Sequence, residues 1–242
     1  MKCVILQPSY IPWRGVFHQI QKADVFVFYD DAQYDKHGWR NRNRVKGPAG
    51  GQWLTIPVKA KGNVIEGTPI NQISICREQK WGRKHWETIR QLYRKTPHFA
   101  RYAPDVEEFL LSDPENLAGF TIRLTEYLAR ELGIVHTRFV LSSQLPSQGA
   151  KTDRLLGILK AVGATHYISG PAARSYLEED KLAAAGISLE YMSYEYPEYP
   201  QLHPPFDSQV SILDLLFMTG HEAPRYIWDQ PTGDVDRRSE AA

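Results

Sequence analysis

The first thirty residues contain two apolar runs separated by a segment with helical spacing. Residues 3–6 and 25–29 are apolar at almost every position, which is typical of strands buried on both faces of a parallel sheet. Residues 13–22 carry their apolar side chains at the spacing of one helix face, at Trp13, Val16, Phe17 and Ile20. The order strand, helix, strand predicts two parallel strands joined by a right-handed crossover.

The same alternation returns in the second half of the chain. Short apolar runs predict strands at residues 137–141, 166–169 and 188–192. Helical patterns separate these runs, at 153–162 and 172–177, and a late helix is expected at 211–219. The middle of the chain is predicted to be helical, at 81–93, 106–111 and 117–132.

The remaining pattern between the first unit and the helical middle predicts antiparallel strands. Residues 40–46 and 53–58 would form a hairpin across the glycine-rich turn at 47–51, and 70–75 a further short strand. We therefore predict an α/β fold with a mostly parallel, Rossmann-like (nucleotidylyltransferase-like) sheet flanked by helices. One α/β domain is expected over residues 1–228, with a helical insertion at about 79–133. A flexible tail is expected at 229–242.

The densest group of polar side chains follows directly on the second apolar run. Asp30 and Asp31 come where that strand ends, which is the edge where open α/β sheets bind ligands. The pair could act as a base, orient an acceptor or hold a divalent cation. The alternative is a solvated turn, or a pair neutralised by nearby arginines. Further candidates for substrate binding in this group are Gln33, Tyr34, Lys36 and Trp39.

Cationic and amide side chains alternate in the next segment. If it is extended, one face carries Arg40, Arg42, Arg44 and Lys46, and the other carries Asn41 and Asn43. The cations could bind phosphate or nucleic acid, or could protect a solvated edge strand from aggregation, which is the more common role for Arg44 and Lys46. Buried amides need hydrogen-bond partners, so a polar ligand is a reasonable partner for Asn41 and Asn43.

Other candidates follow the ends of the remaining predicted parallel strands. The loop after the first strand offers Gln7, Tyr10 and the amides of a helix N-terminus near Arg14, which together suit an anion. His18, one turn further along, is a possible base. Hydroxyls and bare backbone occur at Ser142, Ser143, Ser169 and Gly170, and a late aromatic loop carries Tyr199 and Gln201. Each of these has a purely structural alternative: a tight loop, helix capping, or rings pinned onto the core.

Composition narrows the classes of protein. The net charge is +1, so no overall field draws the chain to nucleic acid or an anionic membrane. The two cysteines form no CxxC pair and the eight histidines show no metal-ligand spacing, so neither residue type predicts a metal site. The sequence leaves the cofactor unknown. The apolar run after Met1 is too short for a signal peptide or a membrane span, so we expect a cytoplasmic protein.

Taken together, these motifs resemble the WbqC-like protein family. The resemblance rests on the opening loop, the acidic pair with its Asn-Arg-Asn block, and later segments, at residues 7–15, 29–43, 53–58, 142–143, 151–155, 163–170, 199–201 and 211–216. It implies a transferase of small-molecule or surface-polysaccharide biosynthesis. The implied reaction is acyl or aminoacyl transfer to the amine of a nucleotide-linked amino sugar or a similar acceptor, with an acyl donor or aminoacyl-tRNA as the other substrate.

Two alternatives remain open from the sequence. One is an RNA-dependent or nucleic-acid-binding protein that uses residues 36–46 as a basic arm. The other is a non-catalytic, ligand-binding partner of a biosynthetic enzyme. Under the leading hypothesis, Asp30, Asp31 or His18 would serve the chemistry, and the remaining candidates would bind substrate.

Overall fold

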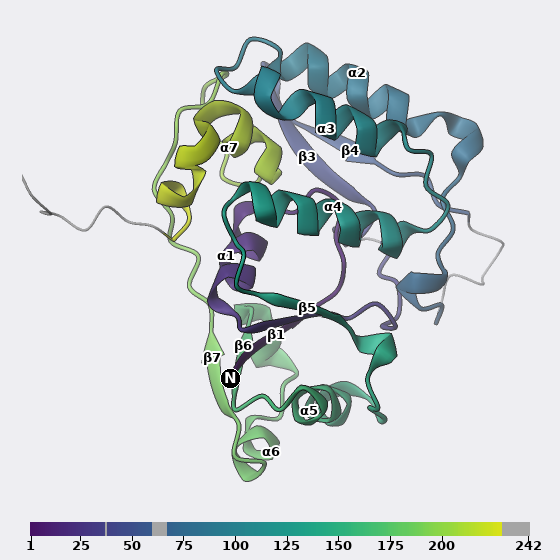
Figure 1. Ribbon diagram of the computed structural model, residues 1–242, viewed down its shortest axis with the longest axis vertical. Coiled ribbons are helices and arrows are strands. Elements are labelled where there is room, and N and C mark those ends of the chain that lie inside the picture. The colour runs from purple at the N-terminus through teal and green to yellow at the C-terminus, as the bar shows by residue number, and fades with distance from the viewer. Residues whose placement is uncertain (37, 60–66, 229–242) are drawn as a thin grey trace, which may run out of the picture.

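The computed structural model describes residues 1–36, 38–59 and 67–228. Its centre is a five-stranded parallel sheet in the order β5-β2-β1-β6-β7 (Figure 1). The strands are β1 (Lys2–Leu6), β2 (Val25–Phe28), β5 (Arg138–Leu141), β6 (His166–Ser169) and β7 (Ser188–Tyr191). This confirms the predicted Rossmann-like sheet. The predicted tail at 229–242 lies outside the described residues.

The sheet is covered on both faces because neighbouring residues of each strand point to opposite sides. Val4, Phe26 and Ile168 join one core cluster, which also contains apolar residues of α1 (Arg14–Lys22) and α4 (Leu117–Glu131). Cys3, Ile5, Val25, Val27 and Tyr167 join a second cluster with α5 (Lys151–Val162) and α6 (Glu179–Ala184). Figure 1 shows the two helical layers on either side of the sheet. Burial on both faces explains why these strands lack polar alternation.

A second, two-stranded antiparallel sheet lies beyond the α1 and α4 layer. Its strands are β3 (Arg42–Gly47) and β4 (Gly50–Thr55) (Figure 1). Near it lie α2 (Trp81–Tyr93), α3 (Phe99–Leu111) and α7 (Ile212–Thr219). The backbones of α2 and α3 approach so closely that a Cβ at Gly82 would lie 1.9 Å from the carbonyl oxygen of Leu110. Only glycine fits at that crossing.

Four local predictions differ from the structure. The second hairpin strand is Gly50–Thr55 and not 53–58, because Gly47 already pairs with Gly50. Residues 70–75 do not form a strand: Ile70–Gln72 is a 3-10 helix, and Ser74 and Ile75 make only isolated bridges. The helix predicted at 106–111 starts at Phe99 and runs through Pro104, because buried Tyr102, Ala103 and Val106 hold it against the core. The helix predicted at 172–177 is a short 3-10 turn, Pro171–Ser175. For the helix Phe99–Leu111, packing outweighed the local effect of Pro104.

Among the described residues, no helix is both long and apolar enough to cross a membrane.

Candidate functional site

The carboxyl ends of β1, β2, β5 and β6 meet at one edge of the sheet. Because β1 lies between β2 and β6, the chain reverses its winding direction beside β1. Crevices at such switch points are where open α/β sheets bind ligands. The structure therefore places at a common edge the ends of the strands that precede Gln7, Asp30, Ser142 and Gly170.

Asp30 is the central side chain of this edge, and it is only 4% exposed. Its Oδ1 accepts hydrogen bonds from the Ser142 hydroxyl (3.0 Å) and the Ser143 backbone amide (2.9 Å). Its Oδ2 accepts one from the Ser143 hydroxyl (2.7 Å). The carboxylate thus joins the end of β2 to the end of β5 and has its acceptor sites filled by the protein. This arrangement suits a positioning role better than proton transfer.

Asp31 is the more accessible member of the pair, with 23% of its side chain exposed. It forms an ion pair with Arg154 of α5 and accepts a hydrogen bond from the Ser142 hydroxyl. One hydroxyl hydrogen therefore faces two carboxylates, and one guanidinium balances two negative charges. The cluster of Asp30, Asp31, Ser142, Ser143 and Arg154, here called the acidic edge, is suited to bind cationic or hydroxyl-bearing groups.

The opening loop is held against this edge by internal contacts. The Gln7 side chain donates to the backbone carbonyl of Gln33 (3.1 Å), and Arg40 donates to the Gln7 carbonyl (3.0 Å). Tyr10 is fully buried, and its hydroxyl lies 2.9 Å from Nδ1 of His85. Burial raises the pKa of Tyr10, and it lowers the pKa of His85 to about 4. Tyr10 is therefore a neutral core residue.

The two amides of the Asn-Arg-Asn block are buried as predicted, but their partners are backbone groups. Asn43 donates to the carbonyls of Tyr10 (3.0 Å) and Ile11 (2.8 Å), and Asn41 donates to the carbonyl of Ile56 (2.8 Å). Ile11 has a φ of 34°, so the loop adopts a strained left-handed conformation at that point. Asn43 thus fixes the shape of the loop. Its partner Ile11 lies 32 residues away in the sequence, so the local pattern of residues around Asn43 could not reveal this role.

Arg14 and His18 both face the C-terminal part of the chain. Arg14 is 4% exposed and donates to the carbonyls of Pro197 (2.8 Å) and Tyr226 (3.1 Å). Burial lowers its pKa, although it stays a cation stacked against Tyr196. His18 Nδ1 lies 3.0 Å from the Tyr196 hydroxyl, and burial together with nearby Lys22 lowers its pKa. These contacts anchor the aromatic loop onto α1.

Tyr199 and Gln201 belong to a buried network around Asp214 of α7. The Tyr199 hydroxyl donates to Asp214 Oδ2 (2.7 Å), and the Gln201 amide donates to the same oxygen (2.8 Å). Burial raises the pKa of Asp214. These two candidates therefore hold the loop to α7.

The cations of the alternating segment are mostly engaged within the protein. Lys46 is only 3% exposed and donates to the Pro205 carbonyl (2.6 Å), so a solvated edge was the wrong expectation for it. Arg44 forms an ion pair with Asp207 (2.7 Å). Lys36 is exposed. These contacts do not favour a basic arm for nucleic acid.

An exposed aromatic pair lies beside the opening loop. Trp39 and Trp53 are 43% and 46% exposed, and their ring centroids are 5.1 Å apart. The Arg42 guanidinium lies over the Trp53 ring at 4.7 Å. The Trp39 carbonyl accepts a hydrogen bond from the Tyr10 amide (3.3 Å). Such rings offer a flat face to a sugar or base. Tyr34 is buried, and burial raises its pKa to about 12.

Ser169 and Gly170 end β6 on the other side of the switch point. Ser169 is 6% exposed and its hydroxyl donates to Tyr167 (3.3 Å). A Cβ added to Gly170 would lie 3.4 Å from the Tyr194 hydroxyl, which places that ring over the strand end. Tyr194 itself packs against Trp13 of the opening loop, with centroids 5.0 Å apart. Tyr194 therefore spans the edge between β1 and β6.

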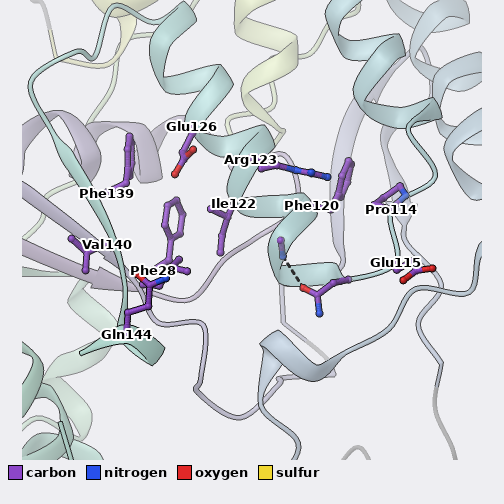
Figure 2. A pocket seen from close by; sticks show the side chains of 13 residues that line it. Phe28, Pro114, Glu115, Phe120, Ile122, Arg123, Glu126, Phe139, Val140 and Gln144 are labelled. Carbon is purple, nitrogen blue, oxygen red and sulfur yellow. Dashed lines mark hydrogen bonds between the residues drawn. The ribbon is translucent and has the colours of Figure 1, made fainter. Parts of the chain in front are cut away.

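A groove of about 540 Å³ lies next to the acidic edge, between α4 and the β2–β5 side of the sheet (Figure 2). Its apolar lining consists of Phe28, Phe120, Ile122, Phe139, Val140 and Leu141. Its charged lining consists of Glu115, Arg123 and Glu126. The remaining lining residues are Pro114, Gly119, Gln144 and Asn116, which caps α4 through the Gly119 amide (2.8 Å).

Sequence reasoning missed this groove. In the sequence, Arg123 and Glu126 lie three residues apart, as on an ordinary solvated helix face. Phe139 lies in an apolar run that is typical of a core strand. The groove exists because β5 is the last strand of the sheet, a property set by the strand order. Neither this groove nor a second hollow of about 500 Å³ beside Lys59 and Arg77 is lined by Asp30 or by Asn41 and Asn43.

The parallel strand order, with a switch point beside β1, defines this protein as a doubly wound α/β protein with a Rossmann-like sheet. Comparison with known proteins goes one step further: the sequence pattern of the WbqC-like protein family matches residues 7–226, and the chain belongs to this family. It is 39% identical over 236 residues to the uncharacterised protein Rv1507c of Mycobacterium tuberculosis, an alignment that covers 93% of this chain and 97% of that protein. No solved structure matches the chain.

Proposed function

We propose that this protein is a transferase of small-molecule or surface-polysaccharide biosynthesis. It transfers an acyl or aminoacyl group to the amine of a nucleotide-linked amino sugar or a similar acceptor. The observation that supports this most is the acidic edge, where Asp31 is the accessible carboxylate beside a switch point of a parallel sheet. Family membership is compatible with a biosynthetic role and does not itself specify the reaction.

The acceptor's nucleotide and sugar rings have suitable partners near this edge. The indoles of Trp39 and Trp53, with the guanidinium of Arg42, offer a stacking surface beside the opening loop. On the other side of the switch point, Gly170 leaves the backbone bare below Tyr194. A ligand bound over the carboxyl ends of β1 and β6 would contact both regions.

The reaction needs a group that removes a proton from the acceptor amine. In acyl transfer the amine nitrogen forms a bond to the carbonyl carbon, and the bond from that carbon to the donor's oxygen or sulfur breaks. The nitrogen loses a proton, and the departing oxygen or sulfur gains one. Asp31 would orient the amine and accept its proton, whereas Asp30 would position Ser142 and Ser143.

Direct assay of transfer tests this proposal. A nucleoside-diphosphate amino sugar with a free amine is incubated with acyl thioesters or aminoacyl-tRNA, and the mass gain of the sugar is followed by mass spectrometry. Loss of a general base lowers turnover by at least about 100-fold, which is the effect expected of Asp31→Asn. Asp180→Asn, an exposed change in α6, is the matched control and should leave turnover unaltered. Full turnover by Asp31→Asn would refute the assigned role.

A further inference from the structure

Glu126 is an unusual side chain in the groove beside the acidic edge. It is half-buried, and within the described residues it has neither a hydrogen bond nor an ion pair. Figure 2 shows its carboxylate directed from α4 into the groove, toward the side where Phe28 and Phe139 lie. A carboxylate beside apolar rings lacks the solvation it would have in water, so it attracts a cation strongly.

The other charged side chains near Glu126 do not form an ion pair with its carboxylate. Arg123 is exposed, and Figure 2 shows it directed toward Phe120 and Pro114. Arg130, one turn along α4, acts on Glu126 only at a distance and forms no ion pair with it. Glu115 is already paired with Arg77 at 2.8 Å. Burial raises the pKa of Glu126, with Arg130 opposing that shift, which agrees with a poorly solvated position.

We infer that this groove binds a small molecule that carries a primary ammonium group on an apolar body, with Glu126 as the partner of the ammonium. The volume of about 540 Å³ lies within the range of small-molecule sites. The stacked rings of Phe28 and Phe139, 5.6 Å apart, supply apolar surface for the body of the ligand. Aromatic rings also attract a cation held near their faces.

The lining excludes two other ligand classes. An anion would meet two carboxylates, Glu115 and Glu126, against the single cation Arg123. A divalent metal would need several oxygen or nitrogen ligands, and the described residues contain no cluster of three or more such side chains. This inference goes beyond the proposed transfer, because it assigns a ligand class to a hollow that Asp31 does not line.

Three probes of similar size test the inference: phenethylamine, phenethyl alcohol and phenylacetate, which end in a cation, a neutral group and an anion. Binding to the full chain is measured by calorimetry and by NMR at pH 7. The amine should bind at least about tenfold more tightly than the alcohol, and the anion more weakly than both. Equal affinity for amine and alcohol, a preference for the anion, or no saturable amine binding would overturn the inference.

Two variants locate the interaction. Glu126→Gln keeps the shape of the side chain and should lower amine affinity about tenfold while leaving alcohol affinity within about twofold. Arg123→Gln, on the same helix, should not weaken amine binding. Unchanged amine affinity in Glu126→Gln, with circular dichroism like that of the parent protein, would refute the assignment. Asp31→Asn should leave probe binding intact, so a failure here is distinguishable from a failure of the proposed transfer.

Discussion

The acidic edge and the neighbouring groove place carboxylates in opposite situations. Asp30 is almost fully buried, yet three donors from Ser142 and Ser143 satisfy it. Glu126 is half-buried among apolar side chains and has no hydrogen-bonding partner in the described part of the chain. The protein thus uses one carboxylate to hold its own strands together and leaves the other ready for a ligand. A dense cluster of polar residues, such as the one around Asp30, therefore need not contain a side chain that is free to bind a ligand.

Removal of the Asp30 carboxylate should give the largest loss of stability among these variants. It tests whether Asp30 holds the ends of β2 and β5 together. Asp30→Ala leaves the backbone amide and the hydroxyl of Ser143 without their acceptor, and it leaves Ser142 with Asp31 alone, so we expect a loss of about 3–5 kcal/mol in the free energy of unfolding. Urea denaturation measures it. Asp180→Ala, at an exposed position, should change stability by less than about 0.5 kcal/mol. If the two variants are equally stable, Asp30 is not the clamp described above.

A pH titration of stability tests the histidine that supports the opening loop. Burial lowers the pKa of His85 in the folded protein to about 4, below its ordinary value of 6.5, so the folded state resists protonation. The contribution of neutral His85 to the free energy of unfolding is therefore fully present above pH 6.5. It is lost as the pH falls toward 4, which lowers the free energy of unfolding by roughly 3 kcal/mol. His85→Phe should flatten that part of the profile, whereas His221→Phe, 84% exposed in its side chain, should not. An unchanged profile in His85→Phe would contradict the assignment.

Asn43 tests how much the loop beside the edge depends on internal contacts. Asn43→Ala leaves two buried carbonyls, those of Tyr10 and Ile11, without their donor. We expect a loss of about 2 kcal/mol in unfolding free energy. Asn41→Ala removes one hydrogen bond, to Ile56, and should lose about half as much. The reverse order in thermal or urea unfolding would show that Asn43 is not the main support.

The smallest effect is expected at Glu126, on the groove side of the comparison. Because its pKa is raised in the folded state, ionisation of Glu126 opposes folding as the pH rises through that pKa. Glu126→Gln removes this opposition, so stability at pH 7 should stay the same or rise by up to ~0.5 kcal/mol. Glu108→Gln, exposed on α3, serves as the control. A clear loss of stability in Glu126→Gln would mean that the carboxylate has a structural partner.

The sequence was sufficient for much of the fold because its strands are continuous apolar runs. Residues 166–169, for example, are predicted and observed as the same strand. The strand order was less accessible, since nothing local shows that β5 lies at the sheet edge. For the same reason the groove with Glu126 was missed.

The sequence was sufficient to predict which residues lie at the candidate site. It was not sufficient to predict what each of them contacts. Asp30, Ser142 and Ser143 were expected at one edge, and the structure joins them. The partners of Asn43 and Arg14, however, lie about 30 to more than 200 residues away, and only the folded chain reveals them. The catalytic role of Asp31 is a prediction that the transfer assay tests.

The contacts of Arg14 have a consequence for how the molecule is made. Its carbonyl partners at Pro197 and Tyr226 lie 183 and 212 residues downstream, and β1 pairs with β6, which begins at His166. During synthesis the first helix therefore emerges long before the carbonyls that accept the hydrogen bonds of its buried guanidinium exist. The native arrangement of the amino-terminal unit must await nearly the whole polypeptide, so early release from the ribosome would yield a chain with an unpartnered cation in its core.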